Sequence, residues 1–166
     1  MMTTELLLRK PIEADIESMY IMLKNSLSLY LTVNNSSSKN LQLIVDRNIV
    51  EEYVKENVYL CLVAQINSEI AGWLAGSSKV DILSKQSCSL GDFYIDKIVV
   101  VSHYRRKDIV GFLLRGILKD QLKGIVVDMP LINIQAIKFY EKSVFVKALG
   151  LSEEFYKTWT RMSKPV

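Results

Sequence analysis

The stretch Ile95–Leu114, IDKIVVVSHYRRKDIVGFLL, decides the fold of this chain. It begins as an apolar strand, continues as a basic turn and ends as an amphipathic helix. That arrangement can hold a phosphate on the backbone amides at the start of the helix. A turn of this kind usually needs glycine where the backbone bends tightly, and this one has Asp108 and Val110. We therefore predict a strand, an anion-binding turn of unusual composition and a helix.

Length and composition indicate one soluble globular domain over residues 1–166. Hydrophobic residues make up 49% of the chain and charged residues 23%, so neither a disulfide nor a metal is needed to explain folding. The 21 basic and 18 acidic side chains leave a net charge of +3. That excess is too small to indicate nucleic acid as a partner.

The cysteines and the apolar segments bear on the location of the protein. Cys61 lies in an apolar run and Cys88 in a polar one. Residues 1–11 lack the apolar run of a signal peptide, and no segment approaches 18 uninterrupted apolar residues. We expect two reduced thiols in a cytoplasmic protein without a membrane partner, and a bridge between the two cysteines stays open.

The residues before the deciding stretch predict a strand, two helices and a hairpin. Both helices repeat apolar residues at the spacing of one buried face. In chain order, these elements are a strand over 6–8, a helix capped by Asp15 with Ser18 and reaching Leu27, a helix from Leu41 to Tyr53, and strands over 58–66 and 70–77. The segment Asn34–Asn40, NNSSSKN, has the composition of a loop.

The rest of the chain predicts four strands and two helices. These are a strand over 93–101, a helix that Asp108 can cap, a strand over 125–128, a helix from Asn133, and two closing strands over 145–149 and 155–162. The order of the elements predicts an α/β fold with a mixed sheet of about seven strands and four helices.

Two motifs make the chain resemble the GCN5-related N-acetyltransferases (GNAT). In that family, a turn of Arg or Gln, two residues, Gly, one residue, and Gly or Ala begins five residues after a valine of the fourth strand. Val100 and Arg105 have this spacing. The second family motif reads N-x-x-A-x-x-F-Y-E-K-x-G-F, and it matches Asn133, Ala136, the segment 139–142 and Phe145.

The resemblance implies a GNAT fold and an enzyme that transfers an acetyl group from acetyl-CoA to a primary amine, without a metal. The amine would attack directly in a ternary complex. Amides of the fourth strand would bond the pantetheine and the acetyl carbonyl, and amides from Arg106 to Gly111 would bind the pyrophosphate. The implied cofactor-binding residues are Val99, Val100, Val101, Arg105, Arg106, Lys107, Asp108, Ile109, Val110, Gly111, Asn133 and Tyr140.

The resemblance also suggests catalytic roles. Tyr140 would protonate the departing CoA thiolate as a general acid, or it is a packed aromatic. Asn133 would bond the pantetheine, cap its helix, or do both. Tyr94 stands where histone-acetylating members have a glutamate, and Asp92 and Asp96 fall on the same strand face as Tyr94.

Either carboxylate could remove the ammonium proton, directly or through water, and we select Asp96 as the general base. The alternative is that both are ordinary charges at the end of a strand. The sole histidine, His103, is expected to be exposed in the turn.

Three family glycines are replaced here by Asp108, Val110 and Val144. Asp108, Val110 and the missing glutamate at Tyr94 motivate an alternative function, a GNAT-fold interaction or regulatory module with weakened or lost CoA binding. The run at 104–107, the segment 139–142 and the Phe155–Tyr156 pair resemble the branch that acetylates protein N-termini. Peptides, small amines and antibiotics stay open as acceptors, and so does the oligomeric state, a homodimer included.

Overall fold

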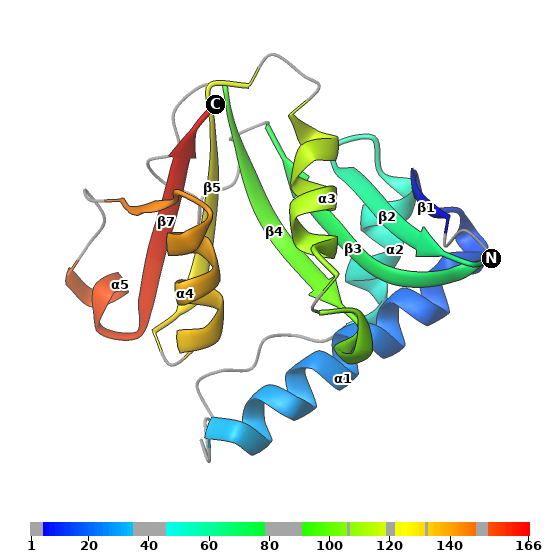
Figure 1. Ribbon diagram of the computed structural model, residues 1–166, viewed down its shortest axis with the longest axis horizontal. Coiled ribbons are helices and arrows are strands. Elements are labelled where there is room, and N and C mark those ends of the chain that lie inside the picture. Colours follow the sequence, from blue (N-terminus) through cyan, green and yellow to red (C-terminus); the bar gives the residue numbers. More distant parts are fainter. Residues whose placement is uncertain are drawn as a thin grey trace. The chain divides into compact units, whose positions relative to one another are not determined.

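The structure of the protein is a computed structural model that describes residues 5–34, 46–78, 91–105, 107–118, 122–131, 133–148 and 153–166 (Figure 1). Its strands are β1 Leu6–Arg9, β2 Leu60–Ile66, β3 Glu69–Ser77, β4 Asp92–Val100, β5 Gly124–Pro130, β6 Val146–Lys147 and β7 Trp159–Pro165. Its α-helices are α1 Ile16–Asn34, α2 Arg47–Lys55, α3 Ile109–Ile117, α4 Ile134–Lys142 and α5 Glu153–Thr158, and 3₁₀ turns η1 Glu13–Asp15 and η2 Ser102–Tyr104 precede α1 and α3.

The strands form one mixed sheet in the order β1-β2-β3-β4-β5-β7-β6. β4 and β5 are parallel, whereas β1 with β2, β5 with β7, and β6 with β7 are antiparallel. This confirms the predicted α/β class and the seven-stranded sheet. The prediction of one closing strand over 155–162 is wrong in its first part, because residues 155–158 belong to helix α5.

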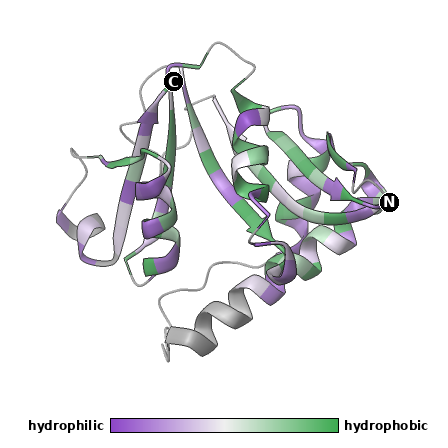
Figure 2. Ribbon diagram, viewed as in Figure 1, coloured by the Kyte–Doolittle hydropathy of each residue, from purple (hydrophilic) through white to green (hydrophobic). Residues whose placement is uncertain are grey.

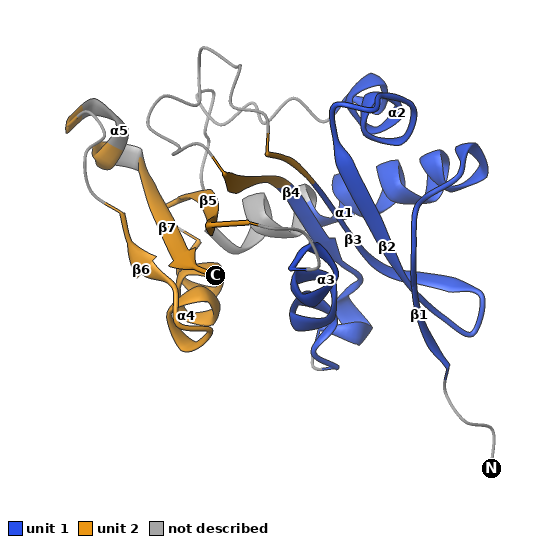
Figure 3. Ribbon diagram, turned by 90° about the horizontal axis from the view of Figure 1, so that it is seen from above, with its two compact units in different colours: residues 1–75, 97–119 blue, residues 76–96, 120–166 orange. Residues whose placement is uncertain are grey.

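The chain divides into two compact units (Figure 3). Unit 1 comprises residues 1–75 and 97–119, and unit 2 comprises residues 76–96 and 120–166. Strands β3 and β4 each contribute residues to both units. The expectation of a single domain over 1–166 stays a prediction.

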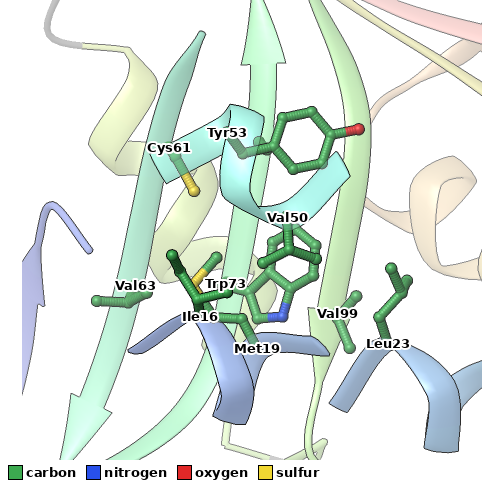
Figure 4. Close-up of a cluster of buried hydrophobic side chains, with 10 residues drawn as sticks. Ile16, Met19, Leu23, Val50, Tyr53, Cys61, Val63, Trp73 and Val99 are labelled. Carbon is green, nitrogen blue, oxygen red and sulfur yellow. The ribbon is translucent and has the colours of Figure 1, made fainter. Parts of the chain in front are cut away.

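Unit 1 packs helices on both faces of its strands. Figure 3 shows α3 on the face opposite to α1 and α2. The core under α1 and α2 contains Trp73, which is buried together with Met19, Val50, Tyr53 and Val99 (Figure 4). On the α3 face, Gly116 lets the helix approach β1 and β2, because a Cβ there would lie 2.5 Å from Leu8. Unit 1 therefore has a hydrophobic layer on each side of its strands.

Two carboxylates fix how helices of unit 1 begin. Asp46 caps α2 by accepting a hydrogen bond from the amide of Asn48 at 2.9 Å. Asp15 accepts from the amide of Ile12 at 2.7 Å and pairs with Arg9 at 2.7 Å, which ties β1 to the start of α1. The Arg9 hydrogen bond holds the pKa of Asp15 below its usual range.

Unit 2 places an apolar layer on one face of β4, β5 and β7. Phe93, Ile125, Val127 and Met162 are buried, and α4 lies against these strands (Figures 1 and 3). Figure 2 shows β5 mainly in the colour of hydrophobic residues, as expected for a central strand. The opposite face carries polar side chains that belong to the candidate site.

Several predictions fall outside the described residues. They concern the loop over 35–40, the start of the second helix over 41–45, Cys88 and Arg106. Cys61 is a buried free thiol, and burial raises its pKa to about 12.

Within the described ranges, no helix is long and apolar enough to cross a membrane. The same ranges contain no group of metal-binding side chains.

Candidate active site

The turn between β4 and α3 carries most of the predicted phosphate-binding residues, all in unit 1. Local hydrogen bonds shape it, from the Tyr104 amide to the Val101 carbonyl at 2.9 Å and from the Lys107 amide to the Tyr104 carbonyl at 3.0 Å. Arg105 and Lys107 are exposed. The amides of Ile109, Val110 and Gly111 belong to the first turn of α3, where no intrahelical acceptor exists. The turn thus presents backbone donors and positive side chains together.

Asp108 has a backbone conformation that favours glycine. Its φ is +52°, in the left-handed region that glycine adopts freely and aspartate tolerates. Asp108 is the N-cap residue of α3, as predicted, but its side chain makes no capping hydrogen bond. The carboxylate instead pairs with Arg115 at 3.2 Å, and both groups are largely exposed.

The Asp108 carboxylate lies over the first turn of α3. A Cβ added to Gly111 would be 2.3 Å from its Oδ1 atom, so the glycine gives the carboxylate room. The first-turn amides therefore keep their hydrogen-bonding capacity, with a negative charge beside them that Arg115 partly balances.

The amides at the end of β4 are not equivalent. The amide of Val101 donates to the Ala71 carbonyl of β3 at 3.0 Å, so this amide is not free for the pantetheine, and any other contact of Val101 with the cofactor stays a prediction. Successive residues of a strand direct their amides to opposite edges. The Val99 amide is therefore directed toward β3, like that of Val101, and the Val99 carbonyl oxygen lies beside Gly72 of β3. Val100 directs its amide to the other edge of β4 and is the remaining donor of the three.

Tyr140 and Asn133 belong to helix α4 in unit 2. Asn133 caps the helix by accepting from the Ala136 amide at 3.2 Å, so capping is confirmed and a contact with pantetheine stays a prediction. Tyr140 is only 3% exposed and packs edge-on against Phe139 and Phe145, with ring centroids 5.3 and 5.0 Å away.

The hydroxyl of Tyr140 is buried and has no hydrogen-bond partner among the described residues. Burial raises the pKa of this phenol, so it stays protonated at neutral pH. A buried polar atom without a partner costs free energy, and among the described residues the Tyr140 hydroxyl shares this state with the Trp73 Nε1 atom in unit 1.

A buried polar network on three strands of unit 2 was not predicted. Arg161 of β7 forms two hydrogen bonds with Asp128 of β5, at 2.7 and 2.8 Å, and the Tyr94 hydroxyl of β4 donates to Asp128 at 2.9 Å. Arg161 is 4% exposed. Burial, followed by the Asp128 charge, raises the pKa of Tyr94, so this phenol is neutral.

Asp96 lies two residues beyond Tyr94 on the same face of β4 and is partly exposed. Its negative charge also raises the pKa of Tyr94. Asp92, the other carboxylate considered, lies next to Gly124 at the start of β5. The role of Asp96 as the base stays a prediction. His103 is exposed, as predicted.

The predicted site residues therefore form two groups. The turn residues and Val99–Val101 lie in unit 1, and Asp96, Asn133 and Tyr140 lie in unit 2. Sequence reasoning missed Asp128 and Arg161. The direct pairing of Asp128 with Arg161 across β5 and β7 depends on a register that only the structure provides.

Comparison with protein-family models gives no match, and comparison with curated protein sequences gives none either. Solved structures match over nearly the whole chain. The PaiA N-acetyltransferase from Thermoplasma acidophilum, in complex with coenzyme A, has a TM-score of 0.75 and 14% identity, and the match covers 98% of this chain and 99% of that chain.

Two further solved structures match this chain over nearly its whole length. An acetyltransferase of the GNAT family from Listeria monocytogenes has a TM-score of 0.74 and 11% identity, with 97% and 95% of the two chains covered. The ribosomal-protein-S18-alanine N-acetyltransferase from Escherichia coli has a TM-score of 0.65 and 13% identity, with 97% and 94% covered. The chain has the GNAT fold, as the sequence predicts.

Proposed function

We propose that the protein is an acetyl-CoA-dependent N-acetyltransferase that acts on a primary amine by direct attack. The observation that carries the proposal is the buried Tyr140 hydroxyl, which lacks a partner among the described residues. Tyr140 also stands in the segment that resembles the family motif around the general acid. A protonated phenol in such a place is suited to donating a proton to a leaving thiolate.

The residues of the turn fit a pyrophosphate. The first-turn amides of α3 are not used by a capping side chain, Arg105 and Lys107 add positive charge, and Asp108 preserves a glycine-like backbone. Acetyl-CoA, when bound, supplies an activated thioester. Backbone amides and a helix start of this kind would hold its phosphates.

Each remaining step would fall to a named group of the chain. The Val100 amide would donate to the acetyl carbonyl as negative charge develops on its oxygen. Asp96 would accept the proton of the attacking ammonium, directly or through water. Tyr140 would give its proton to the sulfur as the carbon–sulfur bond breaks. The second proton that the nitrogen loses would return to the Tyr140 oxygen, so that the amide, the free thiol and a neutral Tyr140 are the products.

The acceptor is either a protein N-terminus or a small amine. The likeness of residues 104–107 and 139–142 to the N-terminal acetyltransferase branch supports the first. The name of the Escherichia coli structure, which specifies a ribosomal-protein alanine, agrees with it. A cytoplasmic location and a homodimer are predictions that accompany this proposal.

Calorimetric titration with acetyl-CoA tests the proposal first. No binding at sub-millimolar acetyl-CoA would overturn the enzyme function and favour the interaction module. That alternative rests on the Asp108 carboxylate over the first turn of α3.

If acetyl-CoA binds, Tyr140→Phe should lower turnover at least tenfold and leave the affinity nearly unchanged, in line with typical losses of general acid catalysis of about 10²–10⁴. Turnover is measured as thiol release with two acceptors, a peptide with a free N-terminus and a diaminoalkane. Tyr59→Phe in unit 1 is the matched control. Equal turnover of Tyr140→Phe and wild type would remove Tyr140 from the mechanism.

A further inference from the structure

Four side chains of unit 1 meet where β3 begins beside the turn that follows β4. The Tyr104 hydroxyl donates to Glu69 at 3.0 Å, and the His103 Nε2 atom lies 3.8 Å from the same carboxylate. The rings of His103 and Tyr104 are 4.1 Å apart. The Lys107 ammonium lies 5.3 Å from the centre of the Tyr104 ring. Glu69, at the start of β3, thus contacts Tyr104 and His103 directly, and Lys107 joins the cluster through the Tyr104 ring.

A second tie joins the same two segments. The Val101 amide donates to the Ala71 carbonyl, two residues after Glu69 in β3. Val101 and Tyr104 are themselves joined by a backbone hydrogen bond of 2.9 Å. The turn is therefore held to β3 by backbone on one side and by the Glu69 carboxylate on the other.

Tyr104 also determines where Lys107 lies. The Tyr104 carbonyl accepts from the Lys107 amide, and the Tyr104 ring faces the Lys107 ammonium in a cation–π contact. Lys107 directly precedes Asp108 and the first-turn amides of α3. Displacing the Tyr104 ring would therefore displace a positive charge of the phosphate-binding turn.

We propose that Glu69 is a positioning residue for the CoA pyrophosphate, which it serves by holding Tyr104 and, through it, the turn. The inference rests on the proposed function. The expected change in CoA affinity is opposite to that from simple electrostatics. A carboxylate near a phosphate site repels an anionic ligand, so its removal alone should strengthen binding. Positioning predicts weaker binding when the acceptor oxygen is lost.

The test compares two variants with the same change in charge. Glu69→Gln keeps a side-chain oxygen that can accept from Tyr104, and Glu69→Ala does not. We expect Glu69→Ala to bind CoA about two- to fivefold more weakly than Glu69→Gln, the range of one exposed charge-assisted contact. Tyr104→Phe should reproduce the loss, and Glu69→Ala with Tyr104→Phe should bind CoA no more weakly than either single variant.

Pantetheine is the matched ligand because it lacks the pyrophosphate. Its affinity should be the same in all of these variants. Glu52→Ala removes an exposed carboxylate of α2 in the same unit and serves as the control variant. The inference is overturned if Glu69→Ala and Glu69→Gln bind CoA equally, or if pantetheine loses affinity to the same extent as CoA.

A measurement without ligand separates this inference from the proposed function. Amide hydrogen exchange at Arg105 and Lys107 should be faster in Glu69→Ala than in Glu69→Gln and Glu52→Ala. If wild type binds neither CoA nor pantetheine, the proposed function and the cofactor role of Glu69 both fall. If the exchange rates of Arg105 and Lys107 in Glu69→Ala equal those in Glu69→Gln, this result alone would overturn the proposal that Glu69 positions the turn.

Discussion

At the scale of single residues, Val144, in the turn after α4, is the one β-branched residue of the described chain with a positive φ. Its φ is +66°, a conformation that a β-branched residue rarely adopts, and the side chain is 70% exposed. The strain is not offset by burial. We predict that Val144→Gly raises the free energy of unfolding by about 1 kcal/mol, the left-handed penalty less the entropy of glycine. Urea unfolding measures the change.

Val146→Gly provides the control for this prediction. Val146 is 59% exposed in β6, and its φ is not positive. Glycine there should destabilise the protein by about 0.5–1 kcal/mol, because it removes β propensity without relieving strain. A destabilised Val144→Gly would show that the valine side chain makes a contribution larger than the strain of its backbone.

At the scale of elements, the turn before α3 combines a favourable backbone with an unfavourable charge. Asp108→Asn keeps a residue that tolerates a left-handed φ and removes the carboxylate beside the first-turn amides. We predict that CoA affinity rises about two- to fivefold, the effect of one exposed charge at a helix start. Calorimetry with CoA measures it.

Arg115→Gln is the counterpart of this variant, since it removes the exposed partner of Asp108. CoA affinity should fall, because the Asp108 charge is then unbalanced, and Asp108→Asn should cancel most of that fall. Unchanged affinity in Asp108→Asn would show that the carboxylate does not act on the phosphates.

A hydrogen-bonded network of side chains joins β4, β5 and β7 in unit 2. Removing its one cation, Arg161, would leave a buried carboxylate without a counter-charge. Arg161→Met would leave the Asp128 carboxylate, only 11% exposed, without its cation. We predict a loss of about 3–5 kcal/mol in the free energy of unfolding, much of it recovered by adding Asp128→Leu. Arg47→Met, which breaks exposed pairs with Glu17 and Glu51, should cost about 0–1 kcal/mol.

Urea unfolding at neutral pH compares these three variants. A loss for Arg161→Met as small as that for Arg47→Met would mean that Asp128 finds another partner or becomes solvated.

The elements show what sequence can and cannot provide. Regular spacing of apolar residues predicts α1, α3 and α4, because each helix buries one face. Alternation over 155–162 predicts a strand, yet residues 155–158 are helical, since a period of two over four residues is too short to decide.

At the candidate site, the sequence likewise predicts what a local motif contains and not what depends on contacts between distant segments. Asn133 and Tyr140 were identified because a local motif contains them. The bonding of Val101 to Ala71, and the pairing of Arg161 with Asp128, depend on strand register and are not local. Asp108 was correctly singled out as a departure, but its φ and its pairing with Arg115 had no sequence signal.

At the scale of the whole molecule, strands β3 and β4 contribute to both compact units. Separating the units would break the backbone hydrogen bonding of those strands, so we predict that the chain unfolds in one cooperative transition. The two tryptophans report on the two units. Trp73 is fully buried in unit 1, and Trp159 begins β7 in unit 2.

Two single-tryptophan variants make this test. Trp159→Phe leaves only Trp73, and Trp73→Phe leaves only Trp159, so each fluorescence signal belongs to one unit. Within each variant, the urea midpoint by fluorescence should equal the midpoint by far-ultraviolet circular dichroism, which makes any loss of stability in Trp73→Phe irrelevant to the comparison. A fluorescence midpoint that differs from the dichroism midpoint would show that the units unfold separately. That result would contradict the single domain expected from the sequence, because two-state unfolding requires coincident transitions from different probes.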